Sequence, residues 1–264
     1  MERRDTLPEQ GEVHVWFVEL AAGAASVEAC FHCLSADERE RASRFCFEHL
    51  RTYFTLSKGI LRVLLGRYLS MAPARIGFAA GPRGKPRLTD PETQLEFNLA
   101  HSGNFAAYAF AVGCQVGVDI EEVRPVPDQE GIVRRFFSPE ECAEWLGLDP
   151  SRREDAFFRC WTGKEAYIKA VGDGLSMPLD SFRVSLRPGV PPSLIYAAGD
   201  PAAASRWSLR SLAPAEGYMG SLAFPEPTRT VRVLPRMTAE ALLELVSGPD
   251  QFPPAATQAS PRQK

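Results

Sequence analysis

An acidic strand followed by a helix with further charges constrains this chain more than any other feature. Residues 116–121 read Val-Gly-Val-Asp-Ile-Glu, so a strand here places Asp119 and Glu121 on one face and the apolar residues on the other. Residues 161–169 read Trp-Thr-Gly-Lys-Glu-Ala-Tyr-Ile-Lys, and a helix here places Glu165 one turn before the closing lysine. If the strand and the helix face each other, three carboxylates meet beside an ammonium group. Such oxygen donors suit a hard divalent cation, Mg²⁺ or Mn²⁺, and a substrate that carries phosphate.

The bulk composition is that of an ordinary folded protein. The chain has 264 residues, of which 45% are hydrophobic and 24% charged, and its formal net charge is −3. This length allows one large domain or two modest ones. No basic excess indicates nucleic acid as a partner. No apolar run typical of a signal peptide opens the chain, and the apolar stretch 54–69 carries three charges, so we expect a cytoplasmic protein without membrane association.

The cysteines are expected to be free thiols, because nothing in the sequence indicates secretion. Cys30 and Cys33 have the spacing of half a zinc or thioredoxin site. A zinc site needs about four ligands, and no second pair of Cys or His follows at the usual spacing. We therefore interpret both residues as part of a short helix that packs a core.

The predicted elements alternate between groups of strands and groups of helices, which indicates an α+β fold. Ser35 and Glu38 form a capping-box signature at the start of one helix, and Ser138 with Pro139 begins another. Strands are expected at residues 13–18, 76–78, 97–100, 106–112, 116–121, 182–186, 207–212, 218–224 and 231–234. Helices are expected at residues 37–47, 51–69, 139–146, 153–171 and 238–246. The proline- and alanine-rich tail from Pro249 is expected to be disordered.

Two further segments carry groups suited to an anion. Residues 83–87 read Arg-Gly-Lys-Pro-Arg, where glycine lets backbone amides approach a phosphate while Lys85 supplies charge. A solvated basic loop is an equally good interpretation of this turn. Asn98 and His101 lie where a predicted strand ends in a turn, and a polar group there can meet a ligand. The neighbouring Ser102 would suit a hydrolase, but no nucleophile-elbow motif accompanies it.

Taken in order, four segments resemble the signature of the 4'-phosphopantetheinyl transferases of the Sfp type. They are Phe-Asn-Leu-Ala-His-Ser-Gly at 97–103, Val-Gly-Val-Asp-Ile-Glu at 116–121, Phe-Phe-Ser-Pro-Glu-Glu at 136–141, and the run from Trp161 to Leu175. The Gly-Lys-Pro turn at 84–86 and the arginine-rich segment before Phe45 also lie where the family has counterparts. The resemblance spans about residues 13–224, and the joint occurrence of these ordered motifs is highly specific.

The resemblance implies a pseudo-dimer of two similar α+β halves in one chain, with coenzyme A and magnesium bound in the cleft between them. We expect a flexible N-terminus at 1–12 and an N-terminal half at 13–114. The C-terminal half, with the metal site, is expected at 115–234, followed by a short helix and disordered tail at 235–264. A chain that holds both halves of its cleft is expected to be a monomer.

The resemblance also implies roles for individual residues. Asp119, Glu121 and Glu165 match the magnesium ligands. The residues that match contacts of coenzyme A are Arg41 for the 3'-phosphate, Lys85 of the Gly-Lys-Pro turn, His101 for the phosphates and Lys169 for the pyrophosphate. Asn98 is a further candidate contact. Glu38 stands where some members have a lysine, so contact with the 3'-phosphate could pass to Arg39, Arg44 or Arg83.

The implied reaction moves the 4'-phosphopantetheine arm from coenzyme A to a serine of an apo acyl or peptidyl carrier protein and releases 3',5'-ADP. Lys169 is expected to neutralise the reacting phosphates. Glu165 is the first candidate for the base that takes the serine proton, and Glu141 is the second. Residues 175–178 either contact the carrier protein or pack into the core.

Two other functions remain open at this point. One is a catalytically inactive module that binds coenzyme A or a carrier protein, although carboxylates that repel one another without a metal argue against it. The other is a different magnesium-dependent nucleotide transferase, which the absence of a Walker-type glycine loop disfavours.

Overall fold

The first half of the chain forms a sheet covered by helices. The computed structural model describes residues 7–81, 83–90, 93–172, 177–247 and 256–257. The strands of this half are β1 (Glu12–Glu19), β2 (Phe78–Ala80), β3 (Pro86–Leu88), β4 (Leu95–Ser102) and β5 (Phe105–Val112). Its helices are α1 (Ala24–Cys33), α2 (Ala36–Ser43), α3 (Glu48–Leu69) and the 3₁₀ turn η1 (Pro73–Arg75). β1, β5 and β4 are antiparallel neighbours in the sheet, while β2 and β3 form a separate hairpin.

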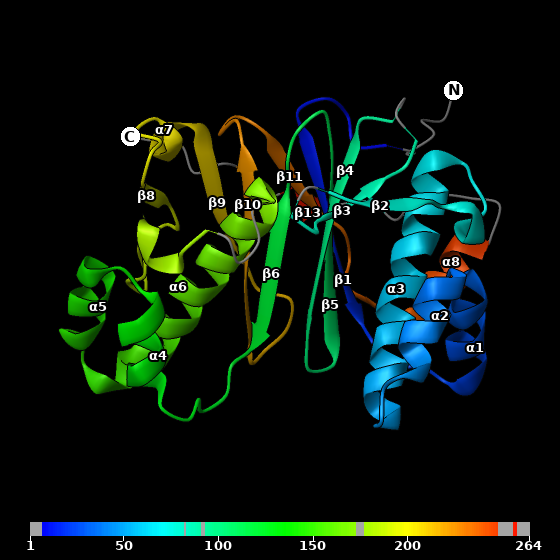
Figure 1. Cartoon of the computed structure of the whole chain (residues 1–264), viewed down its shortest axis with the longest axis horizontal. Coiled ribbons are helices and arrows are strands. Elements are labelled where there is room, and N and C mark those ends of the chain that lie inside the picture. Colours follow the sequence, from blue (N-terminus) through cyan, green and yellow to red (C-terminus); the bar gives the residue numbers. More distant parts are fainter. Residues whose placement is uncertain (1–6, 82, 91–92, 173–176, 248–255, 258–264) are drawn as a thin grey trace.

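The second half places its own helices against a second sheet. The strands are β6 (Gly117–Glu122), β7 (Phe182–Val184), β8 (Leu194–Ala197), β9 (Trp207–Leu212) and β10 (Tyr218–Pro225). The helices are α4 (Gln129–Phe136), α5 (Pro139–Leu146), α6 (Pro150–Val171), the 3₁₀ turn η3 (Leu179–Ser181) and α7 (Ala203–Arg206). β10 lies between β6 and β9, and β7 pairs with β8. The molecule therefore has two sheets in its middle and helices on both outer sides (Figure 1).

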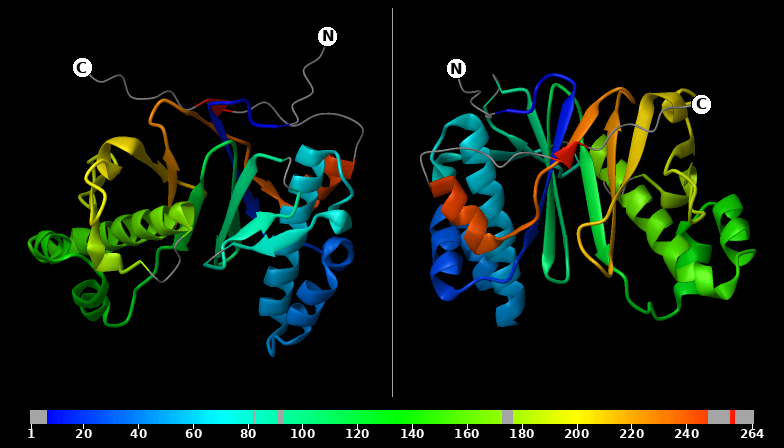
Figure 2. Two further views of the ribbon diagram at one scale, coloured as in Figure 1. Left: turned by 45° about the horizontal axis from the view of Figure 1, so that its top comes forward. Right: turned by 180° about the vertical axis from the view of Figure 1, so that it is seen from behind.

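The end of the chain returns to the first half. β11 (Thr230–Val233) and β12 (Met237–Thr238) pair in parallel with β1, and β13 (Ala256–Thr257) pairs with β11. α8 (Ala239–Ser247) packs against α3 and α1, as Figure 2 shows from behind. The Gly23 amide donates to Glu240 Oε1 at 2.6 Å. A strand from the C-terminal part of the chain, β11, therefore belongs to the sheet of the first half. The division of the chain near residues 114–115 stays a prediction.

Apolar side chains fill three layers between these elements. One cluster joins α3 to the first sheet, a second joins the two sheets, and a third joins α6 to the second sheet. Strand alternation explains the arrangement, because Trp16 and Val18 face α3 whereas Val15 and Phe17 face the other sheet. Among the described residues, no helix has the length and apolar character needed to cross a membrane.

The predicted α+β class and two-half arrangement are confirmed, with differences at element boundaries. α3 begins at Glu48 and α6 at Pro150, each a few residues earlier than predicted. α4 and β8 were not predicted. The capping box is confirmed, since Ser35 and Glu38 exchange bonds between side chain and backbone. The predictions for residues 1–6, for 175–176 and for most of the tail fall outside the described residues.

The contact between β6 and α6 is unusually close and depends on Gly117. A Cβ atom at this position would lie 2.1 Å from the Ala166 carbonyl oxygen and 2.3 Å from the Ala170 amide nitrogen. The two alanines lie one turn apart on α6, so a smooth stripe of small side chains faces the strand. Asp119 and Glu121 follow Gly117 on the same face of β6. Close packing at Gly117 thus directs the acidic face of the strand toward the helix.

We expect Gly117→Ala to destabilise the protein by about 1–3 kcal/mol, because the added methyl group forces two backbones apart. Urea unfolding midpoints measure this change. Gly147→Ala is the matched control, since its Cβ would lie 3.4 Å from the Ala143 carbonyl and its φ is −76°. The control should change stability by less than about 0.5 kcal/mol. Equal effects of both substitutions would contradict the close contact.

Candidate active site

Polar side chains join β4 to β6, although the two strands belong to different sheets. Asn98 Oδ1 accepts a 2.9 Å bond from the Val118 amide. The Ser102 hydroxyl donates to Glu121 Oε2 at 2.7 Å and accepts from the Glu122 amide at 3.1 Å. Buried backbone amides are costly to leave unpaired, so these bonds hold β6 in place. Asn98 thus holds the strand, and Ser102 orients Glu121.

Asp119 is a buried carboxylate with only one of its oxygens paired. Its side chain is 4% exposed, and Oδ1 accepts a 2.6 Å bond from the ammonium group of Lys169 on α6. The other oxygen, Oδ2, is buried and has no hydrogen-bond partner. Buried polar atoms in folded proteins nearly always have a partner. An unpaired carboxylate oxygen at this position indicates that a further cationic or donor group belongs there.

The three predicted carboxylates act on one another. Burial raises the pKa of Asp119 to about 7, opposed by Lys169 and reinforced by Glu121 and Glu165. Burial also raises the pKa of Glu165, while Lys169 opposes the shift and Glu121 adds to it. Carboxylates that disturb each other in this way share one local electrostatic environment. The strand and helix of the prediction therefore do bring Asp119, Glu121, Glu165 and Lys169 together.

The donor set fits a hard divalent cation. Three carboxylates, one with an unpaired buried oxygen, are the ligand type that Mg²⁺ prefers. In the described residues, no group of three or more His, Cys, Asp or Glu side chains is close enough to hold a metal ion as the side chains stand. Asp119 is instead paired with Lys169. Asp119, Glu121 and Glu165 stay the predicted ligands.

Four basic side chains act on one another in sequence and are called the basic row: Lys169, His101, Lys58 and Arg41. Burial lowers the pKa of His101, and the charges of Lys169 and Lys58 lower it further against the opposing effect of Glu121. Burial lowers the pKa of Lys58 as well, with Arg41 among the charges that act on it. Lys58 therefore shares an electrostatic environment with His101 and with Arg41. The sequence prediction omitted Lys58, although a lysine in an otherwise buried stretch of α3 was a usable signal.

The Arg41 guanidinium lies 5.4 Å from the centre of the Phe54 ring on α3, one helical turn before Lys58. Glu38 is used structurally: its carboxylate caps α2 and pairs with buried Arg62 at 2.6 Å. Arg39 and Arg44, the alternative contacts for the 3'-phosphate, also have partners within the protein. Arg39 donates to the carbonyls that end α1, and Arg44 pairs with a glutamate on its own helix.

Lys85 bridges the two halves of the chain. Its ammonium group donates to the Val116 carbonyl at 3.0 Å and to the Ala170 carbonyl at 3.2 Å, and it lies 4.0 Å from Glu96. A cation at the end of α6 is also favoured by the helix dipole. Burial lowers the pKa of Lys85, against the opposing effect of Glu96. Lys85 therefore fastens the β2–β3 hairpin to β6 and α6, whereas Arg83 lies exposed in the hairpin turn.

The structure corrects the expectation that Glu141 could take a substrate proton. Its side chain is fully buried and completes a capping box with Ser138 at the start of α5. Its carboxylate accepts from the Ser138 amide at 2.8 Å and the Val184 amide at 2.7 Å, and pairs with Lys164 at 2.7 Å. A carboxylate enclosed in this way cannot meet a second protein. The Ser-Pro-Glu-Glu spacing was a signal for this structural role.

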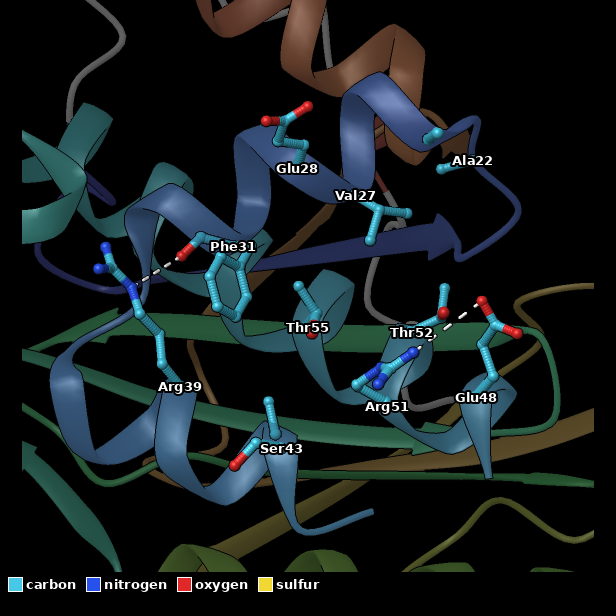
Figure 3. Close-up of a pocket in the computed structure, with 12 residues that line it drawn as sticks. Ala22, Val27, Glu28, Phe31, Arg39, Ser43, Glu48, Arg51, Thr52 and Thr55 are labelled. Carbon is cyan, nitrogen blue, oxygen red and sulfur yellow. Dashed lines mark hydrogen bonds and ion pairs between the residues drawn. The ribbon is translucent and has the colours of Figure 1, made fainter. Parts of the chain in front are cut away.

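A separate cavity of about 610 Å³ lies between α1, α2 and the start of α3 (Figure 3). Its walls combine apolar side chains with hydroxyl groups, two acidic side chains and two basic ones. The residues that line it are Ala22, Ala24, Val27, Glu28, Phe31, Arg39, Ala42, Ser43, Glu48, Arg51, Thr52 and Thr55. None of the three carboxylates belongs to this lining. The cavity therefore does not contain the predicted metal ligands.

Two family models match consecutive parts of the chain. The model of the 4'-phosphopantetheinyl transferase superfamily matches residues 115–223, and that of the N-terminal part of 4'-phosphopantetheinyl transferase matches residues 22–112. The first range contains the three carboxylates and Lys169. The second contains Arg41, Lys58 and His101.

Individual relatives carry the same description. The 4'-phosphopantetheinyl transferase HetI of Nostoc sp. is 39% identical over 214 residues, which cover 80% of this chain and 87% of HetI. The 4'-phosphopantetheinyl transferase Sfp of Bacillus subtilis is 34% identical over 154 residues, covering 58% of this chain and 66% of Sfp. The holo-[acyl-carrier-protein] synthase structure of Thermotoga maritima aligns with a TM-score of 0.34 at 24% identity, over 42% of this chain and 62% of that one.

The metal-free protein should lose stability as the pH rises toward neutrality because of Asp119. Its pKa of about 7 in the folded state exceeds the ordinary value of 3.8, so between these values the folded state retains a proton that the unfolded chain has released. This group then lowers the free energy of unfolding by up to about 1.4 kcal/mol per pH unit.

Asp119→Asn should remove this contribution. Thermal unfolding with a chelator at about pH 5 and about pH 7.5 measures it as the difference between wild type and variant, which cancels the other titrating groups. The stability that Asp119→Asn gains relative to wild type should be larger at the higher pH. A pH-independent difference would show that Asp119 titrates at its ordinary value.

Proposed function

Because the chain belongs to the 4'-phosphopantetheinyl transferase superfamily, we propose that it transfers the 4'-phosphopantetheine arm of coenzyme A to a serine of an apo carrier protein. The carrier is an acyl or peptidyl carrier protein, and 3',5'-ADP is released. One observation carries this proposal: buried Asp119 on β6 is paired with Lys169 on α6 and shares its electrostatic environment with Glu121 and Glu165. We further propose that the enzyme acts as a monomer in the cytoplasm.

Asp119, Glu121 and Glu165 are the residues that would hold Mg²⁺, with Mn²⁺ as a substitute. The unpaired Oδ2 atom of Asp119 supports this assignment, since a cation there would satisfy a buried oxygen. A magnesium ion bound at this site would withdraw charge from the pyrophosphate oxygens and stabilise the departing phosphate. Ser102 supports the set by orienting Glu121 through its hydroxyl group.

Two residues of α6 act on the reacting groups. Lys169 binds the pyrophosphate and balances its charge, since its ammonium group already lies beside the carboxylates. Glu165 accepts the proton of the carrier serine as that hydroxyl attacks the β-phosphorus of coenzyme A. Burial raises the pKa of Glu165, and a base works best when its pKa approaches the working pH. With Glu141 enclosed, Glu165 is the base that we propose.

The nucleotide end of coenzyme A is bound by His101, Lys58 and Arg41. His101 donates a hydrogen bond to a phosphate, and Arg41 and Lys58 bind the 3'-phosphate. Their mutual electrostatic effects support this assignment, since cations held close together favour binding of a dianion. Lys85 and Asn98 contribute by fixing β6 and α6, and Arg83 is a proposed contact from the hairpin turn.

Asp119→Ala and Glu165→Ala should each lower transfer at least about 100-fold, because each removes a ligand that stabilises the transition state. The assay incubates the protein with coenzyme A, Mg²⁺ and several apo carrier proteins and detects the mass gain of the arm. Glu154→Ala is the control, since Glu154 is an exposed acid near the start of α6.

Wild-type protein that modifies none of the carriers would contradict the proposed activity. If it still bound coenzyme A, the chain would instead be an inactive binding module. Retained transfer in either carboxylate variant would contradict the assignment of the metal ligands.

Lys58→Met should raise the KM for coenzyme A about tenfold, which corresponds to the loss of about 1.4 kcal/mol of binding to one charged phosphate. The same variant should treat 3'-dephospho-coenzyme A as wild type does, because that substrate lacks the contacted group. Arg44→Met is the matched control, since Arg44 pairs with Glu40 on its own helix. An equal loss with both substrates would show that Lys58 does not read the 3'-phosphate.

A further inference from the structure

A second charged pair lies buried on another side of α6 from that of Glu165 and Lys169. Glu141 on α5 and Lys164 on α6 are both fully buried, and their charged groups are 2.7 Å apart. Neither group faces solvent or the proposed substrate. Isolated buried charges are strongly unfavourable, so a pair retained here needs a physical reason.

The pair joins four elements of the second half. The Lys164 ammonium donates to the Leu179 carbonyl in η3 and the Phe182 carbonyl in β7, each at 2.7 Å, and lies 4.4 Å from the centre of the Phe182 ring. The Glu141 carboxylate accepts from the Val184 amide in β7 and from the amide of Ser138, the residue that caps α5. Every charged atom is thereby paired, and α5, η3 and β7 are tied to one point on α6.

That point is adjacent to the active site in sequence but faces another direction. Lys164 directly precedes Glu165, and neighbouring residues of a helix point about 100° apart. The closest contact between α6 and β6 is made by backbone atoms of Ala166 and Ala170 at Gly117, so no side chain interlocks the two elements at that point. The bonds of Lys164 hold α6 on another side.

We propose that Glu141 and Lys164 are a positioning pair that fixes the rotation of α6 about its axis, so that Glu165 and Lys169 face Asp119. The inference rests on the proposed function for its effect on transfer. The pair touches neither substrate nor metal. It acts by determining the direction in which Glu165 and Lys169 point from α6. A pair that served stability alone would be replaceable by uncharged residues without loss of activity.

The test compares Lys164→Met with the double variant E141Q/K164M. The single substitution leaves an unpaired buried carboxylate and should be strongly destabilised, whereas the double variant removes both charges and should recover much of that stability. At a temperature where it is fully folded, the double variant should lose about tenfold or more in kcat and in affinity for Mn²⁺. Val133→Ala is the control, a buried α4 residue of the same apolar cluster.

A double variant with wild-type kcat and wild-type Mn²⁺ affinity by calorimetry would overturn the positioning role. If the double variant does not fold, Glu141→Gln alone is measured, since it keeps an acceptor for the Val184 amide while removing the charge. The inference predicts a lower kcat for this variant, and an unchanged kcat overturns it.

The two proposals fail separately in these experiments. Wild-type protein that transfers no arm contradicts the proposed function, while weaker Mn²⁺ binding in E141Q/K164M would still support positioning. Wild-type protein that transfers normally, together with an equally active double variant, contradicts the positioning role alone.

Discussion

The close approach of β6 to α6 is the constraint on which the rest of the structure depends. Gly117 has no side chain to separate the strand from the helix, and small residues on α6 complete the contact. Once these backbones meet, the alternation of the strand directs Asp119 toward the helix and Val118 toward the other sheet. Hydrogen bonds with Asn98 and Ser102 of β4 also hold β6 in place. Backbone packing, rather than attraction between charges, therefore determines where the carboxylates lie.

This arrangement is electrostatically unfavourable without a ligand. Asp119 is buried beside two other acids, and Lys169 balances only part of their charge. Folding free energy from the three apolar layers offsets this cost, as is common where a protein prepares a binding site. A cation and a dense anion bound together would relieve it, because the cation pairs with the acids while the basic row from Lys169 to Arg41 pairs with the anion. The protein can thus gain stability from its ligands.

Periodicity within single elements was sufficient to predict much of this site. The alternation at 116–121 and the four-residue spacing from Glu165 to Lys169 are local patterns, and the α+β class followed from the order of elements. Contacts between distant segments were not accessible in the same way. The enclosure of Glu141 depends on Lys164 and β7, the bridging role of Lys85 depends on α6, and the proximity of Lys58 to His101 depends on how α3 meets β4. The return of β11 to the first sheet likewise leaves no local pattern.

The central claim is that Asp119, Glu121 and Glu165 bind one divalent cation together with the diphosphate of coenzyme A. A crystal structure of the protein grown with Mn²⁺ and coenzyme A, with the anomalous signal of manganese recorded, tests this most directly. The account predicts one anomalous peak bonded to oxygens of all three carboxylates and to the pyrophosphate, with Lys169 released from Asp119. A peak at other residues, or coenzyme A bound in the cavity between α1, α2 and α3 with the carboxylates unchanged, would contradict it.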